Sequence, residues 1–230
     1  MAIRARTGQE ERAEGTAETS TAGTETAGGK KGETQVSTPN WTTQILTQDI
    51  ANTIQVNSGI LVKEFDVAAP KKPAADKIIC DTTGDFSISL VPETTDFFED
   101  INNADVGTKE GLRITGWKGT LSIQAVTVSA DTIKLALGAA QDVANSGISG
   151  KNIYDVAKDF QKLYWLGDMT DPAKIFVIEL DNTISTGGFS FSSKNKGKGT
   201  ISLELQTCKT VQDITKVPMT FYILTKNNEG

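Results

Sequence analysis

The chain has 230 residues and a formal net charge of −6 at pH 7, so it lacks the excess of Lys and Arg that general nucleic-acid-binding surfaces carry. It contains no histidine, which excludes Ser-His-Asp and Cys-His catalysis and histidine-ligated zinc or iron. The two cysteines, Cys80 and Cys208, are too few for a disulfide-built scaffold. Both end apolar or alternating segments, and we expect them to be buried, inert thiols.

The composition changes near Thr38. The first 31 residues are mainly Thr, Ala, Gly and Glu and contain no aromatic residue. Such a segment buries too little apolar area to offset the entropy lost on ordering. We therefore predict a flexible, low-complexity extension over residues 1–38 and one folded domain over residues 39–230. Neither a secretory leader nor a membrane-spanning run of about 18 apolar residues is expected.

The N-terminal half of the predicted domain is rich in β-branched residues and is divided by turn signals. A weak helix is predicted after Thr38. The loop 68–75 contains two prolines and two lysines, which exclude an interior strand. The predicted strands are Thr53–Phe65, kinked near Gly59, then Lys77–Cys80 and Phe86–Val91, joined by a turn at Gly84.

The segment 93–110 is acidic and rich in turn-forming residues, which predicts a long loop. Its carboxylates Asp96, Glu99, Asp100 and Asp105 raise the hypothesis of a calcium site or a carboxylate pair. Their spacing does not match an EF-hand loop and its central glycine. We favour a solvated loop, with Asp96, Glu99 and Asp100 as candidates for contacts between subunits.

The segment 113–140 combines a strand with a short helix. Alternation from Trp117 to Ala125 places one face on a core, and a change of phase at Val126 indicates a bulge or a move from one sheet to another. Ser129 then caps a predicted helix near Ala130–Leu137, which Gly138 ends.

The C-terminal third again predicts strands. Residues 145–150 are predicted as a loop, and residues 153–166 as a strand, a helical turn near Asp159 and a second strand. Further strands are predicted at 174–180, 188–193, 201–206 and 219–225. Strands at this frequency predict a mostly β fold, a β-sandwich or barrel flanked by one short α-helix.

The one basic cluster is the sequence KNKGKG, with Lys194, Lys196 and Lys198. Phosphate binding is one interpretation. The interleaved Asn and Gly residues favour a hairpin tip, and no aromatic residue is present to stack on bases. A third interpretation is assembly, in which these lysines meet the acidic loop of a neighbouring subunit and help to set its register.

Four sequence segments occur in the order seen in one protein family. They are IQVNSGILVKEFD (54–66), the Trp-containing strand followed by SADTIKLALGAA (113–140), LYWLGD (163–168) and STGGFSFSSKNKGKGTISLEL (185–205). Together they resemble the major tail (tail tube) proteins of long-tailed, siphovirus-like bacteriophages. The N-terminal extension departs from that pattern, which begins close to the first strand.

The resemblance implies a β-sandwich closing toward a barrel, in a non-enzymatic virion protein without cofactors. Members of that family form hexameric rings that stack into a tube, the conduit for genome ejection. The implied partners are further copies of the chain and the tape measure, terminator and distal tail proteins, with DNA passing without specific binding. The implied locations are the virion tail and, during assembly, the host cytoplasm. Polar strand positions such as Ser202, Glu204 and Gln206 would then face the bore, where negative charge repels DNA.

Other interpretations remain open. A tail terminator or a distal tail ring has a similar fold and would fit the same residues. A soluble β-sandwich that binds carbohydrate or protein represents a different class. Carboxylates are plentiful enough for a glycosidase pair, but no aromatic cluster accompanies them in a way that favours one. Metal and cofactor sites are not signalled, because phosphate-binding glycine motifs are absent from the sequence.

Overall fold

The computed structural model describes residues 47–57, 59–103, 105–193 and 195–227. The predicted extension and the weak helix after Thr38 lie outside these residues. A four-residue helix, α1 (Gln48–Ala51), begins the described chain, and the Thr47 side chain caps it. The strands that follow before the first long helix are β1 (Ile60–Val62), β2 (Ile78–Asp96) and β3 (Leu112–Ala125), with a 3-10 turn at Ala75–Lys77.

The second half contains one eight-residue helix and seven strands. The helix is α2 (Ala130–Leu137). The strands are β4 (Ala140–Val143), β5 (Gly147–Gly150), β6 (Gln161–Asp168), β7 (Lys174–Ser185), β8 (Ser190–Ser192), β9 (Thr200–Thr207) and β10 (Met219–Thr225). The predicted class is confirmed: the fold is mostly β, with a sandwich-like body and a short flanking helix.

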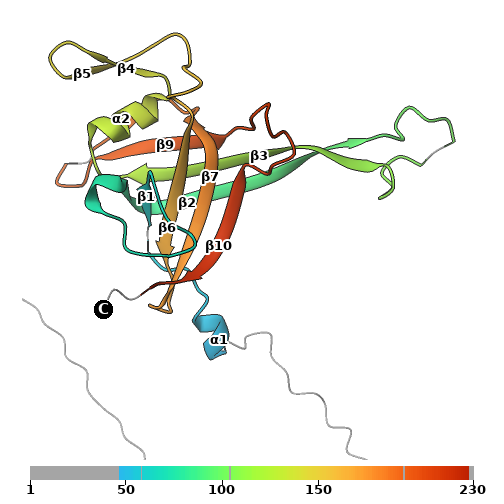
Figure 1. Cartoon of the computed structure of the whole chain (residues 1–230), viewed down its shortest axis with the longest axis horizontal. Helices are drawn as coiled ribbons and strands as arrows, with labels where there is room; N and C mark the ends of the chain where they lie inside the picture. The colour runs from blue at the N-terminus through green and yellow to red at the C-terminus, as the bar shows by residue number, and fades with distance from the viewer. Residues whose placement is uncertain (1–46, 58, 104, 194, 228–230) are drawn as a thin grey trace, which may run out of the picture. The chain divides into compact units, whose positions relative to one another are not determined.

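Eight of the described strands form one sheet that closes on itself, and β4 and β5 form a separate two-stranded sheet. The order of the larger sheet is β10-β7-β6-β1-β2-β3-β9-β8, and an additional pairing joins the end of β7 to β9. One edge of β7 therefore pairs first with β10, at residues 174–180, and then with β9, at residues 183–185. Figure 1 shows β6, β7 and β10 crossing the direction of β2, β3 and β9. The result is a barrel-like sandwich with β8 and β10 at its margins.

The inward face of the sheet carries the main core. Trp165 is fully buried and stacks on Phe86 at 4.4 Å between ring centroids. The alternation predicted for β9 is confirmed, because Ile201, Leu203 and Leu205 are buried. Helix α2 closes one end of the body (Figure 1), and its buried Thr132 hydroxyl donates a hydrogen bond to the Ile79 carbonyl at 3.2 Å. The α2 bounds, the Ser129 cap and the Gly138 end match the prediction.

A smaller apolar cluster lies on the outer face of β6 and β7. Val62, Tyr164, Leu166 and Val177 form its buried centre. Phe65, from the connection between β1 and β2, packs against them, with its ring 6.2 Å from that of Tyr164. The loop predicted over residues 68–75 therefore belongs to a segment that covers part of this face.

The predicted turn at Gly84 is wrong. Residues 78–96 form one continuous strand, and Gly84 occupies a bulge with φ of 70°. Between the pairs Thr83–Gln124 and Ser87–Ser122, β2 advances four residues while β3 advances two. The ladder with β3 continues on both sides of the bulge, so long-range pairing overrides the local turn signal.

Several other boundaries also differ from the prediction. The proposed strand Thr53–Phe65 shortens to β1 plus a bridge between Gln55 and Met169. The predicted bulge at Val126 is instead the end of β3. Residues 147–150 are a strand of the β4–β5 hairpin rather than a loop. Ile153 precedes a turn near Asp159 and is 81% exposed, so the first strand predicted in that region is wrong and only the turn and β6 are confirmed.

Candidate assembly surfaces

The far halves of β2 and β3 form a two-stranded arm. Strand β3 pairs with β9 only from Thr120 to Ala125, and β2 pairs with β1 only up to Asp81. Beyond those points, within the described residues, the two strands pair only with each other, so both outer edges are open. Figure 1 shows this arm projecting from the body. A two-stranded ribbon without a covering layer is marginally stable in water and has edges open to another chain.

Large apolar side chains are exposed along the arm and its connecting loop. Ile114 and Leu112 are 58% and 44% exposed, on the face that continues the core side of β3. The arm tip, defined here by the described residues of 97–111, adds Phe97 and Val106 at 61% and 63% exposure. These apolar residues are inconspicuous in the sequence, because acidic neighbours dominate the segment. The signal available was the presence of Phe, Ile and Val within a segment predicted to be a solvated loop.

The three acidic assembly candidates have different environments. The Asp96 carboxylate accepts hydrogen bonds from the backbone N–H groups of Gly107 at 2.6 Å and Phe98 at 2.9 Å. These two bonds, the Gly107 bond first, lower the pKa of Asp96 below its ordinary value. Asp96 therefore holds the loop together, whereas Glu99 and Asp100 are exposed to solvent.

The basic cluster lies at the other end of β3. Lys196 and Lys198 are exposed in the connection between β8 and β9, whereas Lys194 lies outside the described residues. Strand β9 begins beside Ala125, and the acidic tip adjoins Leu112. Because β3 runs for 14 residues between them, the two charged groups are separated by roughly 40 Å within one subunit. The structure does not bring the predicted acidic and basic candidates together in a single chain.

The outer face of β3 and β9 is polar. The pairs Gln124–Ser202, Ser122–Glu204 and Thr120–Gln206 lie side by side along it. Gln124 donates a side-chain hydrogen bond to Ser202 at 3.2 Å, and Glu204 is exposed. Strand β2 extends the same face through its partners Ser87 and Ser89. The face predicted for the bore is thus rich in hydroxyl and amide groups, with few charges.

A charged network occupies the outer face of β7. Glu179 and Asp181 are 7% and 9% exposed. Lys162 pairs with Glu179, and Lys216 pairs with Asp181 at 2.6 Å. Tyr222 donates a hydrogen bond to the other oxygen of Glu179 at 3.0 Å. Buried carboxylates that each have a cationic partner are typical of structural networks as well as of active sites.

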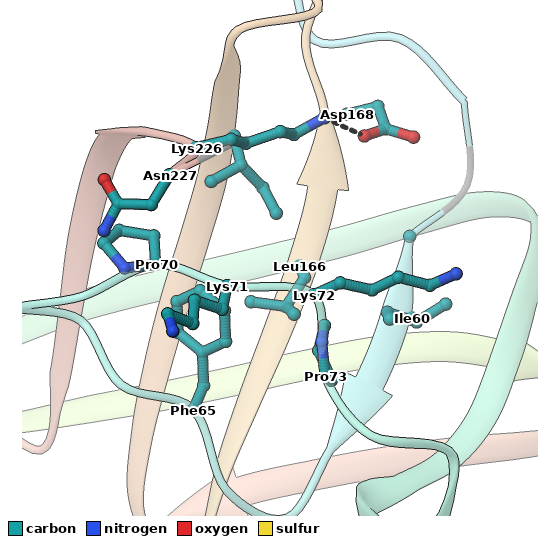
Figure 2. A pocket seen from close by; sticks show the side chains of 12 residues that line it. Ile60, Phe65, Pro70, Lys71, Lys72, Pro73, Leu166, Asp168, Lys226 and Asn227 are labelled. Atoms are coloured by element: carbon teal, nitrogen blue, oxygen red, sulfur yellow. Dashed lines mark hydrogen bonds and ion pairs between the residues drawn. The ribbon is translucent and has the colours of Figure 1, made fainter. Parts of the chain in front are cut away.

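A pocket of about 560 Å³ lies between the outer face of the sheet and the connection from β1 to β2. Figure 2 shows Ile60, Phe65 and Leu166 within it and Lys72 and Lys226 at its border. The Asn227 N–H donates a hydrogen bond to the Pro70 carbonyl at 2.9 Å, which ties the C-terminal strand to the pocket wall. Lys226 pairs with Asp168 at 3.0 Å. No sequence pattern indicates this pocket, because its walls come from three segments that are far apart in the chain.

Both cysteines are free thiols. Cys80 is 1% exposed, and burial raises the pKa of its thiol to about 12. Cys208 follows the end of β9 and is only half-buried, so its prediction as a buried strand residue is wrong. Among the described residues, no group of three or more His, Cys, Asp or Glu side chains is arranged to hold a metal ion. No helix in the described parts of the chain has the length and apolarity needed to cross a membrane.

No protein-family model matches the chain, and no curated protein matches its sequence. Two solved structures resemble it at 12% sequence identity and a TM-score of 0.35. One is the virion of a native gene transfer agent particle, covering 72% of this chain and 95% of the matched chain. The other is the tail of an empty gene transfer agent particle with C6 symmetry, covering 71% and 95%. At this level of likeness, the function has to follow from the residues of this chain.

Proposed function

We propose that the chain is a structural virion protein, the tail tube subunit of a long-tailed bacteriophage. In this role it self-assembles into hexameric rings that stack into a conduit for the genome. The four sequence segments that resemble tail tube proteins motivate the proposal. The chemistry of the described residues is compatible with it, because the conspicuous features are exposed edges and apolar surfaces.

The arm is the observation that carries the proposal. Its two open edges and its exposed apolar side chains have no covering layer within the described subunit. Contiguous exposed apolar surface of this kind marks protein interaction sites. Copies of the same chain would supply the missing layer in a ring or a stack, where a repeated head-to-tail contact closes.

The polar face of β3 and β9 is the proposed lining of the bore. Hydroxyl and amide groups such as those of Ser122, Ser202 and Gln206 keep a surface hydrated without attracting phosphates. Glu204 adds local negative charge, which repels DNA within roughly one Debye length, about 8 Å at physiological ionic strength. The proposed partners are the tape measure, terminator and distal tail proteins. The proposed locations are the virion tail and, during assembly, the host cytoplasm.

Negative-stain electron microscopy of the purified full-length chain, with light scattering on the same sample, tests the proposal. Hollow rings or tubes with a central bore are expected. Imaging a chain that begins at Thr38 would then show what the extension contributes. Closed particles without a bore would contradict the proposal. A chain that stays monomeric even after purified tail initiation complexes are added would also contradict it. Copy number per particle separates a tube subunit from a terminator or a distal tail ring.

A further inference from the structure

We propose that the pocket bordered by Pro70 and Pro73 receives the arm tip of a second copy of this chain. The inference deepens the proposed function and rests on it, because it assigns a receiving surface to a subunit that self-assembles. Neighbouring subunits would then be joined head to tail, with the tip of one seated in the pocket of the next.

The tip and the pocket have matching apolar surfaces. The tip presents Phe97, Ile101 and Val106, whose exposed fractions are 61%, 52% and 63%. The pocket presents Ile60, Phe65, Leu166 and Ile175, together with two prolines. A volume of about 560 Å³ is large enough for more than one side chain. Seating the tip would remove both apolar surfaces from water, and within one subunit the described residues do not cover either surface.

The charges around these surfaces are complementary. Glu99, Asp100 and Asp105 surround the apolar residues of the tip and are exposed. Lys71, Lys72 and Lys226 line the pocket together with a single carboxylate, Asp168. The pair of Lys226 and Asp168 is partly exposed, so exchanging partners within it costs little. Opposite charges on the two borders would orient the tip and exclude wrong partners.

A subunit cannot seat its own tip. Ile60, which lines the pocket, pairs with Asp81 of β2. Asp96, at the base of the tip, lies fifteen residues further along the same strand, from residue 81 to residue 96. A regular strand of that length spans roughly 50 Å, and the bulge at Gly84 shortens this span only slightly. A tip seated in the pocket must therefore come from another copy of the chain.

One tip in one pocket buries less surface than a stable dimer of about 800 Å² per partner requires. The isolated contact is therefore weak, and its effect accumulates where every subunit makes it twice, once with its tip and once with its pocket. This favours ordered assembly over stable dimers in dilute solution.

Charge reversal gives the first test. One full-length variant carries Lys72→Glu and Lys226→Glu, and the other carries Glu99→Lys and Asp100→Lys. Each variant alone opposes like charges, so we expect light scattering from assemblies to fall at least tenfold. In an equal mixture, each tip meets a pocket of opposite charge, and scattering should recover at the same total concentration. A mixture that assembles no better than its components would overturn the proposal.

A disulfide test locates the contact. In a Cys208→Ser chain, Val106→Cys is combined with Pro73→Cys, and a ladder of linked oligomers is expected on non-reducing gels. The matched control combines Val106→Cys with Val128→Cys, which is 60% exposed and does not line the pocket. Equal ladders from both pairs, or no ladder from the Pro73 pair, would contradict docking. A small apolar molecule can also be added to the Pro73→Cys chain. If it shields this cysteine from a thiol reagent but does not reduce association, the tip does not occupy the pocket and docking is contradicted.

Electron microscopy separates failure of docking from failure of the proposed function. If the wild-type chain forms tubes and both charge-reversal variants form them equally well, docking is refuted and the proposed tube function stands. If the equal mixture of variants recovers association, but the mixture and the wild-type chain form only open chains of subunits and never rings, docking is supported and the tube function is refuted. A wild-type chain that does not associate at high concentration, together with a Val106→Cys and Pro73→Cys variant that forms no linked oligomers, would refute docking.

Discussion

The ammonium of Lys162 lies 2.5 Å from a carboxylate oxygen of Glu179, a residue that is 7% exposed. Burial is the largest single effect and lowers the pKa of the ammonium, but the hydrogen bonds and charges of Glu179 and Tyr164 together outweigh burial and raise that pKa. A cation with a raised pKa stabilises the folded state fully below its unfolded pKa of about 10.4 and less as pH rises through the folded value. Measurements at neutral pH therefore report the whole contribution.

Replacing this lysine should destabilise the fold. Lys162→Met leaves the buried Glu179 without its ammonium, and we expect a loss of about 1–3 kcal/mol in the free energy of unfolding, reduced by the partial exposure of Lys162. Urea denaturation measures it. Lys158→Met is the matched control, because Lys158 is 81% exposed and pairs with Asp155 at 3.8 Å. Equal stability of both variants would show that the network contributes nothing.

The closure of the sheet depends on close packing at Gly119. A Cβ atom added there would lie 2.5 Å from the Thr207 hydroxyl oxygen and 3.0 Å from the Met219 methyl carbon. Gly119→Ala should cost about 1–3 kcal/mol, because the buried Thr207 hydroxyl, which donates a hydrogen bond to the Gly119 carbonyl at 3.3 Å, and the Met219 methyl group must move to make room. Gly150→Ala is the control, since its nearest neighbour would be a carbonyl oxygen at 3.8 Å. Denaturation midpoints that fall equally for both would contradict this view of the core.

The Asp96 carboxylate should control the order of the arm tip without affecting the body. Asp96→Ala removes the acceptor for Gly107 and Phe98, so those two amides should exchange hydrogen faster while the global unfolding midpoint stays nearly constant. The lowered pKa means that the carboxylate contributes above about pH 3.9 and loses its contribution as pH falls through the folded value. Asp105→Ala, at an exposed position in the same tip, should leave both amides unchanged.

The two thiols should differ in reactivity. Cys80 is 1% exposed and its pKa is raised by burial to about 12, so almost no thiolate forms at neutral pH. In the native protein, a thiol reagent should modify Cys208 slowly and Cys80 not at all, and both should react in urea. Rapid native labelling at Cys80, located by mass spectrometry, would show that the barrel opens near β1 and β2.

Elements with a local signal were predictable from the sequence. Strand β10 matches its predicted bounds, because Pro218 precedes a run of aromatic and β-branched residues. Strand β9 differs by one residue at each end, because its alternation assigns both a strand and a buried face. Helix α2 matches too, since its cap at Ser129 and its end at Gly138 are signals within a dozen residues. The absence of histidine and the low cysteine count restricted the chemistry before any fold was known.

Elements that depend on distant partners were not predictable. Gly84 gives a turn signal, yet β2 continues through it, because β3 supplies a ladder on both sides of the bulge. The hairpin of β4 and β5 pairs residues with weak strand propensity of their own. For the candidate surfaces, sequence placed acidic and basic residues in named loops but could not show that β3 separates them.

The sequence alone determined the β-rich class, the short helix and the acidic, histidine-free chemistry, because propensity, periodicity and caps act between near neighbours. Only the tertiary structure decided that β7 closes the sheet against β9, that β2 and β3 extend beyond it as an arm, and that Ile60, Pro73 and Lys226 meet around one pocket. Those contacts join residues far apart in the chain. Register and packing of the whole core select them, and no local window contains that information.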